Sequence, residues 1–113
     1  LEPVLMVLLR FQGPQALAPY GRHLTPELLR RAPLIGAAWM AQTGHPEATA
    51  RYLAAASARP MIDWDRDIWL ATAARLRGTA GHRLLLGQAT RDPGLRLALA
   101  RGFIAPADPA PAP

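Results

Sequence analysis

Short apolar stretches, each broken by proline or glycine, run along the whole chain. Within most of them the apolar residues recur every three or four positions, which is the spacing of one face of an α-helix. Valine, isoleucine and other residues that favour strands are scarce. The pattern therefore predicts an all-α protein of about six to seven short helices, folded back on one another in antiparallel pairs.

The first stretch, Leu1–Gln12, predicts a helix that has almost no polar face. Pro3 suits its first turn, where a missing backbone N–H costs nothing. A helix that is apolar nearly all round is stable only when more than one of its sides is covered. We therefore expect this helix to pack between other helices or to be covered by a partner chain.

The next two segments differ in how strongly they favour a helix. Gly13–Thr25 holds two prolines and two glycines and predicts a long turn or a short broken helix. Thr25-Pro26-Glu27 is a strong helix start, with a capping threonine, a proline in the first turn and an acid at the positive end of the helix dipole. The proline at position 33 should end this helix at Ala32 and begin the next one.

The segment Pro33–Pro60 predicts two alanine-rich helices that fold back on each other. The first should run to Thr43, a Gly-His-Pro break follows at Gly44–Pro46, and the second should cover Glu47–Ser57. Glycine and proline at the break are residues that end helices and form turns.

The segment Pro60–Gly78 predicts the longest helix of the chain, with aspartates at its start and arginines in its last turn. One face should be apolar and buried. We expect that face to consist of Ile62, Trp69, Ala73 and Leu76.

Two more helices are expected, at Thr79–Thr90 and Gly94–Arg101. The last nine residues, Ala105–Pro113, alternate alanine and proline with one aspartate, which predicts an extended, polyproline-like tail. The chain should therefore consist of one helical domain, residues 1–104, and this tail, residues 105–113.

Within Pro33–Pro60 the spacing of small and aromatic residues resembles a tetratricopeptide (TPR) repeat over about residues 29–60. The matching positions are Ile35, Gly36, Trp39, Gly44, Ala48, Tyr52, Ala55 and Pro60. One position departs from the pattern, because Ala32 stands where the family has a tryptophan. A second, degenerate repeat follows, and the alternative is a helical bundle without repeats.

The TPR resemblance implies a binding function. In that family the first helix of each repeat lines a concave groove, and at the matching positions the groove would present the residues Ala37, Met40, Ala41, Asp67, Ala71 and Arg75. Family members that clamp a peptide's terminal carboxylate use asparagine and lysine, and this chain contains neither. The resemblance therefore implies a groove for an apolar helix or an extended peptide.

The charge balance offers a different function. Thirteen arginines against eight acids give a net charge of +5, and no lysine is present. Such a balance suits nucleic acid or another anionic surface. The residues that would contact it are those of the last two helices, namely Arg83, Arg91, Arg96 and Arg101. The arginines are spread singly, so they equally fit solvated helix faces.

The sequence contains no recognisable catalytic or metal-binding constellation. Without cysteine there is no disulfide or cysteine-based zinc site, and the three histidines are far apart in the sequence. Asp63-Trp64-Asp65-Arg66-Asp67 begins like a calcium loop, but Ile68 and Ala74 occupy its glycine and glutamate positions. Ser57 has no histidine or acid in a triad-like pattern, and no phosphate-binding glycine loop is present. We expect no cofactor, no metal and no enzymatic activity.

Three hypotheses remain. The leading one is a protein–protein interaction module, a scaffold or adaptor with a protein partner or a second copy of itself. The others are a nucleic-acid or anionic-surface binder, and an accessory domain of a larger enzyme. The chain starts at Leu1 rather than at methionine, which fits a processed product or a piece of a longer protein. No apolar run is long enough to span a membrane, and the composition suits a periplasm as well as a cytosol.

Overall fold

The computed structural model describes residues 1–102, apart from the side chains at positions 98, 101 and 102. The expected tail at 105–113 and the end of the expected domain at 104 lie outside this part of the chain. The described part is all-α, as the sequence predicts, and contains no strand. Its elements are α1 (Glu2–Gln12), the 3-10 helix η1 (Pro14–His23), α2 (Pro26–Arg31), α3 (Pro33–Gln42), α4 (Pro46–Ser57), α5 (Asp63–Ala74), α6 (Ala80–Ala89) and α7 (Pro93–Gly102).

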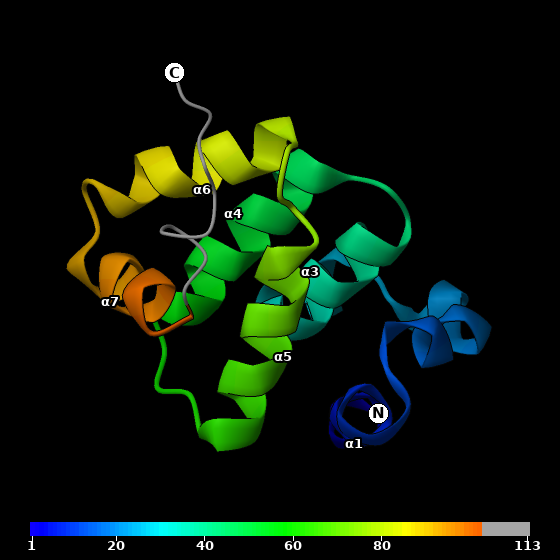
Figure 1. Ribbon diagram of the computed structural model, residues 1–113. Coiled ribbons are helices and arrows are strands. Elements are labelled where there is room, and N and C mark those ends of the chain that lie inside the picture. Colours follow the sequence, from blue (N-terminus) through cyan, green and yellow to red (C-terminus); the bar gives the residue numbers. More distant parts are fainter. Residues whose placement is uncertain (103–113) are drawn as a thin grey trace.

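Helix α3 lies at the centre of the molecule and contacts α1, η1, α2, α4 and α5 (Figure 1). Every residue from Ala32 to Ala38 is buried. Such complete burial is possible because this helix carries no charged side chain that would need water. The break between α2 and α3 falls at Ala32, as the proline at position 33 predicts.

Helices α3 and α4 form the antiparallel pair that the sequence predicts, joined by a turn at Gly44 with φ of 81°. Gly36 is small where the two helices approach, since a Cβ there would lie 2.7 Å from Cδ1 of Tyr52. Ala48 is half-buried, and Ala55 is exposed on the outer side of α4. The close approach therefore depends on Gly36 and Tyr52, and Ala55 takes no part in it.

The prediction of one long helix over Pro60–Gly78 is wrong at both ends. Helix α5 has 12 residues, the same length as α4, and begins only at Asp63. Beyond Ala74 the chain tightens into turns that end at Gly78, where φ is 81°. Arg75 and Arg77 consequently lie beyond the helix instead of in its last turn.

The expected buried face of α5 is correct except for one residue. Trp69, Ala73 and Leu76 are buried, whereas Ile62 is 62% exposed. Ile62 precedes the helix in an extended conformation, so its side chain does not follow the helical spacing.

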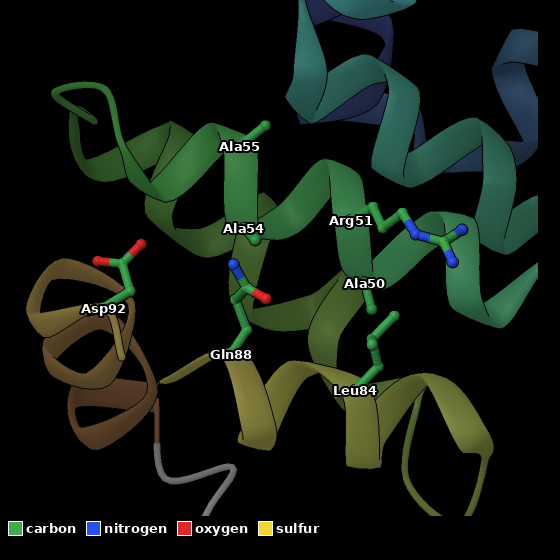
Figure 2. A pocket seen from close by; sticks show the side chains of 7 residues that line it. All are labelled: Ala50, Arg51, Ala54, Ala55, Leu84, Gln88 and Asp92. Atoms are coloured by element: carbon green, nitrogen blue, oxygen red, sulfur yellow. The ribbon is translucent and has the colours of Figure 1, made fainter. Parts of the chain in front are cut away.

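Helix α6 runs beside α4 in the same direction. At its start, a Cβ on Gly81 would lie 2.3 Å from the carbonyl oxygen of Pro46, the first residue of α4. Further along, Leu84 faces Ala50 and Gln88 faces Ala54 (Figure 2). Helix α7 then begins near the end of α4, with Gly94 close to the backbone of Ser57.

Two groups of buried residues form the core. One is centred on Trp69 and Leu53 and joins α3 and α4 to α5, α6 and α7. The other is centred on Leu5, Leu17 and Ile35 and joins α1, η1, α2 and α3. Partly buried side chains of Met6, Tyr52 and Ile68 pack against both groups, which makes the core continuous.

Candidate functional site

The described residues expose large apolar side chains mainly in one region. Of the eight large hydrophobic residues that are exposed, six lie on α1 or around the start of α5. We call this region the α1–α5 surface and define it by Leu1, Val4, Val7, Phe11, Ile62 and Trp64. Grouped apolar side chains of this kind are characteristic of protein-binding surfaces, whereas single exposed ones are common everywhere.

The sequence of α1 explains why this surface is apolar. Leu5 and Leu9 point into the core and are 0% and 5% exposed. Helix α1 lies at one edge of the molecule (Figure 1), and its other face is only partly covered, by the start of α5. There Val4, Val7 and Phe11 are 50%, 49% and 69% exposed. The expectation that α1 packs between other helices agrees with its contacts to η1, α3 and α5. Cover of its exposed side chains by a partner chain stays a prediction.

Aromatic side chains from two helices meet in the middle of this surface. The rings of Phe11 and Trp64 are 6.3 Å apart in an edge-to-face arrangement. The guanidinium of Arg10 lies 5.7 Å from the Phe11 ring and 5.0 Å from the Trp64 ring. Aromatic residues and arginine are the types most enriched at the energetic centres of protein interfaces.

Ion pairs border the α1–α5 surface. Two of the three pairs found among the described residues lie here, namely Arg10–Asp67 at 3.7 Å and Arg31–Glu2 at 3.4 Å. In the third pair, Arg66–Asp63 at 3.1 Å, the arginine lines a cavity toward α7. Exposed pairs of this kind contribute little to stability. Their effect is to neutralise the border of the apolar region, while the chain as a whole is basic.

A groove of about 400 Å³ adjoins this surface, between α1, the junction of α2 and α3, and the segment that leads into α5. Its lining is mostly apolar and includes three prolines, two methionines and one tryptophan. These residues are Pro3, Pro33, Pro60, Met6, Met61 and Trp64. The charged groups at its edge are Glu2, Arg31, Arg59 and Asp65.

A second cavity, of about 420 Å³, lies between α4 and α6 (Figure 2). Alanines form its α4 side, and Arg51 extends away from Leu84 and Gln88. Asp92 at its end accepts hydrogen bonds from the backbone N–H groups of Gly94 and Leu95, at 3.0 and 3.2 Å. Its carboxylate therefore caps α7, and we assign this cavity no function.

The groove residues implied by the TPR resemblance separate into two sets. Ala37 is fully buried in the core, and Met40 and Ala41 are half-buried. Asp67, Ala71 and Arg75 lie together around a cavity of about 280 Å³, which Leu9 and Arg10 of α1 also line. Helix α1 thus contacts α3 and α5 beside the residues that the TPR resemblance assigns to the groove.

Arg75 has a contact that the sequence does not suggest. Its guanidinium donates to the backbone carbonyl of Ala41 at 3.4 Å and to Oε1 of Gln42 at 3.3 Å. A cation at the C-terminal end of a helix is favourable there because of the helix dipole. Arg75 therefore ties the end of α5 to the end of α3.

The anion-binding hypothesis requires arginines whose side chains are exposed and not already paired with an acid. Arg83, Arg91 and Arg96 are exposed and have no ion pair among residues 1–102. The side chain of Arg101 lies outside the described residues. Nothing among the described side chains gathers three or more metal-ligating groups. None of the described helices is long and apolar enough to cross a membrane.

The sequence predictions did not single out Phe11 and Trp64 as site residues. The relevant signal was present, because the apolar character of the first helix led us to expect a covering partner. Trp64 could not be found in this way, since its contact with Phe11 joins segments more than fifty positions apart. Comparisons of the chain with protein-family models, curated proteins and solved structures gave no match.

Proposed function

We propose that this chain is a non-enzymatic protein–protein interaction module, a scaffold or adaptor, which binds an apolar helix or an extended peptide through the α1–α5 surface. The observation that carries the proposal is the grouping of six exposed hydrophobic residues around the Phe11–Trp64 contact. Burial of such a group contributes about 25 cal/mol per Å² of apolar surface removed from water. The ion pairs at its border are exposed and can stay hydrated beside a bound apolar partner, which avoids the cost of desolvating them.

We propose further that α3 and α4 form a TPR-like helix pair. The close approach of Gly36 to Tyr52 and the turn at Gly44 support this reading. The support stops at this pair, because α6 makes its main contacts with α4 and α7. In this proposal the TPR-like pair supports α1 and α5, which pack against it.

Substitution of Phe11 by glutamate should abolish partner binding. A buried charge at the centre of an interface should cost at least about 2 kcal/mol, which is roughly a 30-fold loss of affinity. The measurement is a pull-down with the immobilised chain, quantified by mass spectrometry. The side chain of Phe11 is 69% exposed, so the variant should keep the helical circular dichroism of the parent.

Leu97→Glu is the matched control for this experiment, because Leu97 is a similarly exposed hydrophobic residue on α7. We expect it to retain every partner that the parent recovers. A partner that both variants retain binds elsewhere, and recovery of no specific partner by the parent chain would contradict the proposed function.

A second candidate function is binding to nucleic acid through α6 and α7. The observation that favours it is that Arg83, Arg91 and Arg96 are exposed without ion pairs in the described part. In that case affinity for a DNA duplex should fall steeply with salt, with a log–log slope of about −0.9 for each phosphate contacted. Replacement of all three by alanine should make this slope shallower, and an unchanged slope would exclude these residues.

A further inference from the structure

The groove beside α1 has the chemistry that a proline-rich segment requires. Peptides in the polyproline conformation bind grooves lined by aromatic and apolar side chains, because little conformational entropy is lost on binding. Here Trp64, which is 46% exposed, stands beside two methionines and three prolines. The flat indole of Trp64 and the flexible methionine side chains can pack against proline rings without hydrogen bonds.

The chain itself contains a segment of that kind. Residues 105–113 read Ala-Pro-Ala-Asp-Pro-Ala-Pro-Ala-Pro, with Asp108 as the only ionisable side chain. We propose that this segment binds the groove beside α1 of its own chain. The inference rests on the proposed function in one respect, since the groove belongs to the same face as the partner-binding surface.

The charges at the groove suit a single carboxylate. Arg31 already pairs with Glu2 at 3.4 Å. Arg59 donates a hydrogen bond to the carbonyl of Arg31 at 2.6 Å and has no carboxylate within ion-pair distance among the described residues. Asp65 is the remaining acid that lines the groove. Arg59 and Met61 also line a neighbouring cavity toward α7, and Asp65 does not. Asp108 therefore has one suitable partner, Arg59.

The distance also permits binding within one chain. The first residues of α7 line the same cavity as Arg59 and Met61, which in turn line the groove. A ten-residue helix is about 15 Å long, so residue 102 lies within about that distance of the start of α7. The six residues from 103 to 108 span up to about 19 Å in a polyproline conformation. Asp108 can therefore reach Arg59.

Binding in this way would shield part of the α1–α5 surface. A tethered segment acts at an effective concentration in the millimolar range, so even weak contacts would keep the groove occupied. A partner that needs the groove would have to displace the segment first. The segment would thus act as an internal competitor of the proposed partner.

The experiment uses a paramagnetic label on the full chain. Since the chain has no cysteine, Ala110→Cys provides one site for a nitroxide label. We expect the label to remove most of the NMR intensity of the Trp64 indole and of the Met61 and Ile62 amides. Amides in the first turn of α6 should keep their intensity. Uniform effects over the whole surface, or none at Trp64, would overturn the proposal.

The second part of the experiment exchanges the charges of Asp108 and Arg59. Asp108→Arg and Arg59→Asp should each restore the Trp64 signal, and the double variant should lose it again. Arg83→Asp, a change of the same charge at an exposed site on α6, should have no effect. If the double variant does not regain the label effect, Asp108 and Arg59 are not in contact, which overturns the proposal.

A mixture of labelled chain and unlabelled, ¹⁵N-enriched chain identifies the source of the segment. Intensity loss in the enriched chain would show that the segment comes from a second copy, which overturns binding within one chain. The Phe11→Glu pull-down is independent of these measurements. Loss of partner binding in that variant without a label effect at Trp64 would leave the proposed function intact and exclude this inference.

Discussion

Replacement of Trp69 by alanine should lower the free energy of unfolding by about 3–5 kcal/mol, the range for removing a large buried aromatic side chain. Trp69 is fully buried in the core group that joins α3 and α4 to α5, α6 and α7. Its indole N–H also donates to the backbone carbonyl of Leu53 at 2.8 Å. Domains of this size are stable by about 5–15 kcal/mol, so the variant should be largely unfolded under mild denaturing conditions. Urea denaturation followed by circular dichroism measures the loss.

Trp64→Ala on the same helix is the matched control. Trp64 is 46% exposed and contacts Phe11 and Arg10. Its loss should cost about 1 kcal/mol, the scale of an exposed aromatic pair. Equal losses for the two tryptophans would show that α5 does not have the buried face described here.

Proline and glycine explain why so much of the fold could be predicted. The limits of α1, α3, α4, α6 and α7 all fall within one or two residues of the expected positions. At Pro33 and Gly44 the local chemistry alone decides where the chain must break, because proline lacks an N–H and glycine allows a positive φ. Such signals need no knowledge of tertiary structure.

The ends of α5 could not be predicted in the same way. Pro60 suits the first turn of a helix, and the expected helix began there. In the structure Arg59 and Pro60 instead form part of the groove beside α1, which depends on contacts between distant segments. The expected aspartates are present at the start of α5, as Asp63 and Asp65 of its first turn.

The packing partner of each helix was the least predictable feature. Spacing within α6 indicates which residues are buried, and it does not indicate what covers them. The decisive residue is Gly81, which looks like a helix-weakening glycine in the sequence. In the structure its missing side chain allows α6 to meet the start of α4.

A second prediction with a large expected effect on stability follows from the contact between Gly81 and Pro46. Gly81→Ala should destabilise the protein by about 1–3 kcal/mol, the usual cost of adding atoms to a packed site. The new Cβ would lie 2.3 Å from the carbonyl oxygen and 2.7 Å from the carbonyl carbon of Pro46. Both are backbone atoms, so no side chain can rotate away, and α6 must shift relative to α4. Urea denaturation of parent and variant checks the loss.

Gly87→Ala tests whether this effect belongs to the contact or to the residue type. Gly87 lies in the same helix, is exposed, and has no atom within 4 Å of the position that a Cβ would take. Alanine there should therefore stabilise the helix by about 0.5–1 kcal/mol, because glycine loses more backbone entropy on folding. The two substitutions should change stability in opposite directions. If both stabilise, α6 is not held against Pro46, and the parallel packing of α4 and α6 is wrong.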